Sequence, residues 1–261
     1  MSDQTKFNNK LAGKRVLIIG GSAGIGYGVA EGALENGAHV TISSSNSDRV
    51  KDAISKLQKA YPSAKDRIDG HAASMGDEAS LEQNVTELLE KVGKVDHIVY
   101  TAGDSLAMLE IQKATFEQIK KAGMVRFFAP LLVAKHASKY LNNSVESSIT
   151  LTTGSVSERP RPNWTVVNGY ATGLQGMCRG LALDLKPIRV NLISPGAIET
   201  DLWAHIPQEK RQEVFKTMGQ GMATGKIGQT EDVAEAYLYC MKDKNVTGSM
   251  ISSNGGALLM S

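Results

Sequence analysis

The apolar residues of this chain fall into short runs that alternate with longer amphipathic stretches. Five runs rich in Val and Ile have the length of strands and are separated by segments with helical periodicity. They lie at residues 14–20, 38–45, 96–103, 147–154 and 188–196, and weaker strand patterns lie at 67–74 and 248–256. Such alternation is typical of a parallel sheet covered by helices on both faces. The pattern therefore predicts an α/β fold, a Rossmann-type doubly wound parallel sheet of about seven strands.

The pattern runs through the chain without a Pro- or Ser-rich linker and without an internal repeat, so residues 1–261 are expected to form a single domain. Residues 1–11 are mostly polar and are expected to form a loose N-terminus. Residues 203–225 break the rhythm after the run at 188–196 and predict a helical insertion. Because doubly wound folds bind ligands at the carboxyl ends of their strands, this insertion is expected to act as a lid.

The composition is that of an ordinary globular protein, with 41% hydrophobic and 21% charged residues. Its net charge of +2 and dispersed basic residues favour small-molecule partners over nucleic acid or an anionic membrane. The chain shows neither a signal peptide nor an apolar run of membrane-spanning length, so a cytoplasmic protein is expected. Cys178 and Cys240 lie among apolar neighbours without zinc-ligand spacing, so we expect core residues and no metal site.

A glycine-rich turn follows the first predicted strand and leads into a helix that closes at Gly37. Gly20 allows the chain to turn, Gly24 allows the backbone to approach a pyrophosphate, and Gly26 allows the helix to pack against the strand. The first N–H groups of that helix would face the phosphates. The turn predicts a dinucleotide site, and the alternative is a merely tight strand-to-helix connection.

The spacing Gly20-x3-Gly24-Ile25-Gly26 resembles the short-chain dehydrogenase/reductase family, although Ile19 stands where the family usually has Thr. Further family motifs are matched at residues 100–103, 195–200 and 246–256, so the resemblance covers the chain from about residue 12 to its end. It implies a set of cofactor-binding positions. These are Gly20, Gly21, Ser22, Ala23, Gly24 and Ile25 in the turn, Ser74 and Met75 beside adenine, Thr101, Ala102 and Gly103 beside the nicotinamide ribose, and Pro195, Gly196, Ile198 and Thr200 at the carboxamide end.

The choice of nicotinamide cofactor depends on the end of the second predicted strand. An NAD-selective site needs a carboxylate there to bind the ribose hydroxyl and repel a 2′-phosphate. This chain offers Ser44, Ser45 and Asn46 instead, with Arg49 one helical turn further on. We therefore predict NADP(H), a preference that would reverse if Asp48 rather than Arg49 faced the ribose. The same Ser and Asn residues also fit a helix cap.

In most members of the family a Tyr donates the proton to the carbonyl that is reduced, and a Lys four residues later lowers the pKa of this Tyr. In one alignment Tyr170 is the donor and Leu174 takes the place of Lys. In the alignment that we prefer, which has no gap to the following helix and strand, the Tyr and Lys positions become Val167 and Ala171. The Lys is missing in both, and Tyr170 in the preferred register is expected to pack against a neighbouring helix.

Two other usual catalytic positions of the family can also be aligned with this chain. The family's Ser falls at Gly154 or Ser155, and its Asn falls at Arg126. The proton relay is therefore absent while the residues that hold the cofactor remain. We take Arg126 to replace the relay electrostatically, anchoring substrate or cofactor beside the nicotinamide.

Residues 159–164, Arg-Pro-Arg-Pro-Asn-Trp, are expected to form a stiff loop in which Trp164 lies either beside the substrate or in the core. Within the family this loop is similar to that of a fungal subgroup which includes bifunctional reductase/Diels-Alderases of indole alkaloid biosynthesis. That subgroup has Pro-Asp-Pro-Gly-Trp, whereas this chain has Arg161 for the Asp and Asn163 for the Gly. Arg161 would disfavour a cationic substrate and, with Arg126, stabilise an anion, or it is a solvated loop charge.

Three functions are compatible with this sequence. The leading hypothesis is an atypical NADPH-dependent oxidoreductase that transfers hydride to a C=O, C=N or activated C=C bond of a secondary-metabolite-type substrate, with Arg126, Arg161 and Trp164 as candidate catalytic residues. The alternatives are a reductase/Diels-Alderase-like pericyclase and a non-catalytic NADP(H)-binding protein. The resemblance also implies a homo-oligomer, a dimer or a tetramer.

Overall fold

The computed structural model describes residues 6–204 and 206–260. In this part of the chain seven strands form one sheet in the order β3-β2-β1-β4-β5-β6-β7, and every neighbouring pair is parallel. The strands are β1 (Arg15–Ile19), β2 (His39–Ser44), β3 (Ile68–Ala72), β4 (His97–Tyr100), β5 (Ser148–Thr152), β6 (Arg189–Pro195) and β7 (Met250–Ser253). Each lies within a run expected to form a strand, so the predicted doubly wound sheet is confirmed.

Eight α-helices of the described residues connect the strands and cover the sheet. They are α1 (Gly24–Glu35), α2 (Ser47–Ala60), α3 (Leu81–Val92), α4 (Phe116–Gly123), α5 (Ala129–Ala137), α6 (Thr165–Asp184), α7 (Gln208–Gln220) and α8 (Thr230–Lys242). A π-helical turn (Met124–Phe128) joins α4 to α5, and 3-10 turns lie at Pro62–Arg67, Ser155–Ser157 and Asp201–Trp203. Among these helices none is long and apolar enough to cross a membrane.

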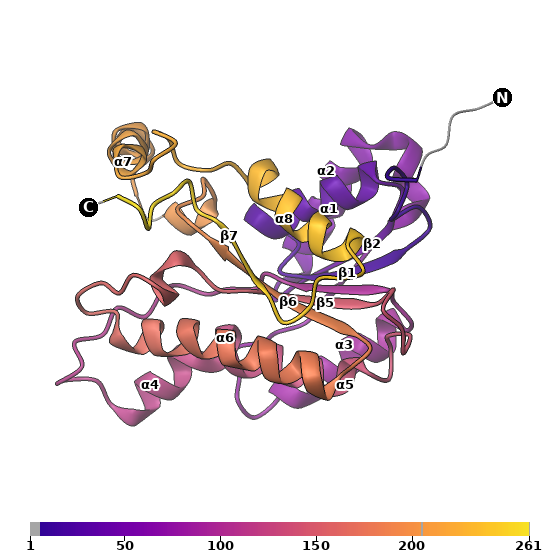
Figure 1. The fold of residues 1–261 in the computed structure, drawn as a ribbon, viewed down its shortest axis with the longest axis horizontal. Coiled ribbons are helices and arrows are strands. Elements are labelled where there is room, and N and C mark those ends of the chain that lie inside the picture. Colours follow the sequence, from indigo (N-terminus) through magenta and orange to yellow (C-terminus); the bar gives the residue numbers. More distant parts are fainter. Residues whose placement is uncertain (1–5, 205, 261) are drawn as a thin grey trace.

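The core has two halves because successive strand residues point to opposite faces of the sheet. Val16 and Ile18 of β1 belong to one apolar cluster with residues of α1, α2 and α8, whereas Leu17 and Ile19 belong to another with residues of α3, α5 and α6. Figure 1 shows these two helical layers on opposite sides of the sheet, with α7 set apart near the C-terminal segment. The continuous burial of these strands explains why they are apolar runs rather than alternating ones.

The core also contains both cysteines and the last residue of the N-terminal segment. Cys178 and Cys240 are both buried, as expected, and burial raises the pKa of the Cys178 thiol to about 11 and that of Cys240 to about 12. Of the N-terminal segment 1–11, residues 1–5 lie outside the described part, residues 6–10 are exposed, and Leu11 is fully buried in the core. The chain is therefore anchored from Leu11 onward.

The strand order places a crevice at the carboxyl ends of β1 and β4. The chain first builds outward through β2 and β3 and then crosses back to place β4 on the other side of β1. The loops after β1 and β4 therefore lead in opposite directions, which is where doubly wound folds bind their ligands. The insertion expected at 203–225 contains α7 and follows β6 at this same edge.

Candidate active site

A cavity of about 1290 Å³ opens at the carboxyl ends of the strands. Its walls come from the turn after β1, the ends of β2 to β6, the π-helical turn, the 159–164 loop and α7. Most of the predicted cofactor positions line it: Gly20, Ser22, Ala23, Gly24, Ile25, Ser44, Ser45, Arg49, Ser74, Met75, Thr101, Ala102, Gly103, Arg126, Pro195, Gly196, Ile198 and Thr200. Gly21 and Asn46 were predicted to bind the cofactor as well, but neither lines the cavity.

The glycine turn packs against the loop after β4. Gly20 has φ of 96°, and a Cβ on it would lie 2.4 Å from the backbone N of Ala102. A Cβ on Gly26 would lie 2.3 Å from the carbonyl oxygen of Gly20. Ala23, the residue before α1, makes no side-chain hydrogen bond to cap the helix, so the first-turn N–H groups have no side-chain acceptor there. This turn has the glycines and the helix N-terminus that bind a pyrophosphate.

The far end of the cavity lies beside β2 and the start of α2. The Arg49 guanidinium donates to the Ser45 hydroxyl at 3.5 Å, and both residues line the cavity. Asn46 instead accepts from the backbone N–H groups of Asp48 and Arg49 at 2.9 and 3.0 Å, so its side chain caps α2. Asp48 pairs with Lys51 at 3.3 Å and does not line the cavity. Arg49 therefore faces the site and Asp48 does not.

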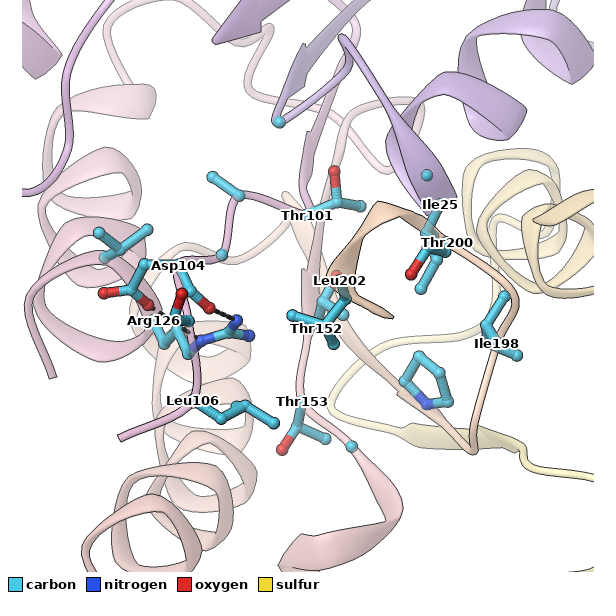
Figure 2. A pocket seen from close by; sticks show the side chains of 18 of the residues that line it. Ile25, Thr101, Asp104, Leu106, Arg126, Thr152, Thr153, Ile198, Thr200 and Leu202 are labelled. Atoms are coloured by element: carbon cyan, nitrogen blue, oxygen red, sulfur yellow. Dashed lines mark hydrogen bonds and ion pairs between the residues drawn. The ribbon is translucent and has the colours of Figure 1, made fainter. Parts of the chain in front are cut away.

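Arg126 projects into the cavity from the π-helical turn, a type of local distortion that is frequent at functional sites. Its Nε donates to Asp104 Oδ1 at 3.1 Å, and its Nη2 donates to the Asp104 carbonyl. A Cβ on Gly103 would lie 2.7 Å from Cζ of Arg126, so the guanidinium rests directly against that glycine. Figure 2 shows Arg126 and Asp104 together on one side of the cavity, across from Thr200.

Two opposing effects act on the pKa of Arg126. Burial lowers this pKa, and the Asp104 carboxylate partly offsets the shift by raising it, so the guanidinium stays charged. Asp104 was not among the sequence-predicted residues. Its position directly after the Thr-Ala-Gly motif at the end of β4 is a signal that could have identified it.

The positions aligned with the usual Ser and Lys lie just beyond the end of β5 and in α6. Gly154 lines the cavity, and a Cβ on it would meet only Val156 Cγ1 at 3.7 Å and the Pro195 carbonyl at 3.9 Å. The Ala171 carbonyl accepts from the Thr153 hydroxyl at 2.8 Å, which places residue 171 beside the end of β5. Leu174 is buried in the core. Ser155 lines the cavity as well, so the position of the usual Ser stays at Gly154 or Ser155, and Ala171 as the position of the usual Lys stays a prediction.

Tyr170 lies away from the cavity, against α4 and the π-helical turn. Its hydroxyl donates to the Ile119 carbonyl at 3.1 Å, and its ring centroid is 5.2 Å from that of Phe127 and 5.9 Å from that of Phe128. Burial raises its pKa above the usual value. Tyr170 does not line the cavity, so it packs between helices as the preferred alignment predicts.

The 159–164 loop and the region of α7 form the opposite wall. Arg159, Pro160, Arg161 and Trp164 line the cavity, and Cζ of Arg161 lies 5.5 Å from the Trp164 ring centroid. Trp164 thus faces the cavity, one of the two positions considered for it. Asn163 has φ of 63°, a left-handed conformation that favours Gly and then Asn. A Gly would adopt this conformation equally well, so the backbone of this chain is compatible with either residue at position 163.

The insertion after β6 contributes Trp203, Thr217, Met218 and Met222 to the cavity wall. The Trp203 indole donates to the Ile198 carbonyl at 2.8 Å. Phe215, Met222 and Ile227 form a small separate apolar cluster, against which Trp203 and Met218 pack. The expected lid segment therefore forms part of the cavity wall, and its action as a lid stays a prediction.

Comparisons with known proteins agree with this architecture. A family profile described as the SDR-like Rossmann domain matches residues 7–260. The chain is similar to the short-chain dehydrogenase/reductase fsr5 of Gibberella fujikuroi (45% identical, covering 99% of this chain and 100% of the relative) and to malC of Malbranchea aurantiaca (40%, covering 99% and 100%).

Solved structures give the same assignment. The structure of MalC reductase/Diels-Alderase from Malbranchea aurantiaca superposes with a TM-score of 0.90 at 41% identity, covering 96% of this chain and 98% of that one. A small-chain dehydrogenase in complex with NADPH has a TM-score of 0.73 at 28% identity, covering 95% and 99%. The resemblance to a fungal group of this family is thereby confirmed.

Proposed function

Since the chain belongs to the short-chain dehydrogenase/reductase family, we propose that it is an atypical NADPH-dependent reductase whose proton relay has been replaced by the Arg126–Asp104 pair. The observation that carries this proposal is a cavity lined by the cofactor positions of the family, with Arg126 at the expected place of the usual Asn and Gly154 or Ser155 at that of the usual Ser. A substrate of secondary-metabolite type, reduced at a C=O, C=N or activated C=C bond, fits the similarity to fsr5 and malC.

The residues present fit a nicotinamide cofactor. The glycine turn and the N-terminus of α1 would hold the pyrophosphate, and Ser45 with Arg49 would hold a 2′-phosphate. Thr101 would lie at the nicotinamide ribose, and its hydroxyl already donates to the Ile19 carbonyl at 3.2 Å. NADPH bound in this way would supply the hydride. The similarity to a family member in complex with NADPH supports the same cofactor.

Arg126 provides positive charge where the substrate oxygen or nitrogen gains electron density. Hydride addition leaves an alkoxide, amide or enolate, and a preorganised guanidinium stabilises such an anion in a site with little water. The two hydrogen bonds that the guanidinium donates to Asp104 fix its direction, so little reorganisation is needed during the reaction. The proton that completes the reduction then comes from solvent or from the substrate itself, because a Tyr with a raised pKa outside the cavity is a poor donor.

The substitution Arg126→Ala tests this assignment. Loss of a charge-assisted contact worth about 1.5–3 kcal/mol should lower kcat roughly 10- to 150-fold. The dissociation constant of NADPH should change about threefold or less, since Arg49 and the glycine turn carry most of that affinity. An equal loss in kcat and in NADPH affinity would mean that Arg126 merely holds the cofactor. Tight NADPH binding without oxidation by any carbonyl, imine or enone would favour the non-catalytic function.

A reductase/Diels-Alderase-like activity is the second candidate, favoured by the superposition with MalC. Arg161 is the residue that argues against an identical substrate, because a guanidinium in place of an Asp repels a cationic intermediate. Arg161→Asp should therefore increase binding of a cationic iminium-type ligand and decrease binding of a carboxylate. Cyclisation of a diene substrate without net NADPH oxidation would support this second function over the first.

We further propose that the protein works in the cytoplasm as a homo-oligomer. Gly169, Gly176 and Gly180 of α6 are exposed, and a Cβ on any of them would meet no atom within 4 Å. Such a helix surface permits close approach of a second helix. Size-exclusion chromatography with light scattering distinguishes monomer, dimer and tetramer.

A further inference from the structure

The segment that follows β7 folds back over the part of the cavity that the 159–164 loop and α7 line. Ala257 and Leu258 both line the cavity, together with the 159–164 loop and α7. The backbone turns through hydrogen bonds from Ala257 N to the Asn254 carbonyl at 3.1 Å and from Leu259 N to the Gly256 carbonyl at 3.0 Å. In Figure 1 this yellow C-terminal segment runs beside α7. Residues 257–260, which we call the tail, thus form part of the cavity wall.

One side chain connects the tail to the 159–164 loop. Nη1 of Arg159 donates to the Ala257 carbonyl at 3.0 Å and to the Met260 carbonyl. Both acceptors belong to the tail, about a hundred positions away in the sequence. No carboxylate of the described residues lies within ion-pair distance of Arg159. Within the described part of the chain its guanidinium is therefore engaged with backbone carbonyls.

The turn that precedes the tail, and Ala257 of the tail itself, contact the lid region. The backbone N–H of Thr224 donates to the Gly255 carbonyl at 3.1 Å, and Ala257 packs on the apolar cluster that contains Phe215 and Met222. Gly255 has φ of 61°, and a Cβ on it would lie 2.8 Å from the Thr224 hydroxyl oxygen. The tail therefore lies between the 159–164 loop and the lid, with contacts to both.

We propose that Arg159 is a positioning residue that holds the tail in place as a wall of the substrate pocket and thereby sets which substrates fit. This inference rests on the proposed function, in which Arg161 of the same loop influences which substrate binds. A guanidinium reaches both carbonyls from one rigid group, whereas a shorter side chain reaches neither. When both bonds are lost, the tail keeps only its contacts with the lid, and the part of the cavity wall formed by Ala257 and Leu258 loses its fixed shape.

Amide hydrogen exchange of the holoenzyme tests the contact between Arg159 and the tail directly. Arg159→Ala should increase the exchange rate of peptides that contain residues 256–260 at least tenfold, because the Leu259 N–H is then protected only by a free-standing turn. Arg159→Lys should restore part of the protection. Arg161→Ala is the matched control, since that guanidinium lies over Trp164 and has no bond to the tail; it should leave the exchange unchanged. Wild-type protection in Arg159→Ala would overturn the proposal.

Kinetics separate positioning from a general loss of structure. With phenanthrenequinone as a bulky planar carbonyl probe, Arg159→Ala should raise KM at least fivefold, with kcat and NADPH affinity changed less than twofold. A fall in kcat at unchanged KM would contradict a role in shaping the pocket. The exchange experiment needs no turnover, so it decides the role of Arg159 even where the proposed reductase activity fails.

Discussion

The contact between the glycine turn and the loop after β4 leads to a prediction with an internal control. Gly20 and Gly13 both have positive φ, 96° and 72°, so an Ala at either position pays a similar backbone cost of about 1–2 kcal/mol. Only at Gly20 does the new Cβ meet the backbone, 2.4 Å from Ala102 N, whereas at Gly13 nothing lies within 4 Å. Moving that backbone to relieve the overlap adds about 1–3 kcal/mol to the loss of stability. Gly20→Ala should thus destabilise the protein by about 2–5 kcal/mol and Gly13→Ala by about 1–2 kcal/mol.

Urea unfolding of the two variants measures the difference, and NADPH titration measures its effect on the site. Because Gly20 and Ala102 line the same cavity, the shift that relieves the clash also separates two cofactor-binding loops. Gly20→Ala should weaken NADPH binding at least tenfold, while Gly13→Ala should leave it unchanged. Equal destabilisation of the two variants, or unchanged NADPH affinity in Gly20→Ala, would refute the view that the two loops are packed to their limit around the cofactor.

Three further substitutions test other parts of the account. Arg49→Ala should weaken NADPH binding roughly 10- to 150-fold, the loss of about 1.5–3 kcal/mol, and leave NADH binding unchanged in the same fluorescence titration. Tyr170→Phe should cost about 1 kcal/mol in urea unfolding, from the lost bond to the Ile119 carbonyl, with kcat unchanged; a 100-fold loss of kcat would restore Tyr170 as proton donor. Burial lowers the pKa of His97 to about 3, below its unfolded value of about 6.5. The contribution of His97 to the free energy of unfolding is therefore fully present above about pH 6.5. It falls by about 1.4 kcal/mol per pH unit as the pH decreases, or by about 2 kcal/mol at about pH 5. His97→Asn, which can keep the bond to Ser148, should remove that part of the pH dependence of urea unfolding, and identical pH profiles would exclude His97 as its source.

The strands and the glycine turn could be predicted because their signals are local in sequence. Even the weak run at 67–74 forms β3, since its pairing with β2 is set by the parallel sheet rather than by its own propensity. The preferred alignment of α6 also followed from a continuous local match, and the position of Tyr170 between helices agrees with it. These features depend on residues within one element or on neighbouring elements of a known order.

The parts that sequence could not provide depend on contacts between distant segments or on local distortion. Asp104 pairs with Arg126 because the π-helical turn directs that side chain toward the end of β4, and no periodicity rule predicts such a turn. Asn46 is expected both as a cofactor contact and as a helix cap; its Oδ1 caps α2, and the cofactor contact of its amide N–H groups stays a prediction. The bonds from Arg159 to the tail have no local signal at all.

The central claim is that the cavity binds NADPH in preference to NADH. Titration of the purified protein with each nucleotide, followed by nicotinamide fluorescence, tests it without knowledge of the substrate. The account predicts tight binding of NADPH and binding of NADH that is at least tenfold weaker, because Ser45 and Arg49 face the cavity and Asp48 does not. Binding of neither nucleotide would contradict both proposed activities, and equal or tighter binding of NADH would contradict the role given to Arg49.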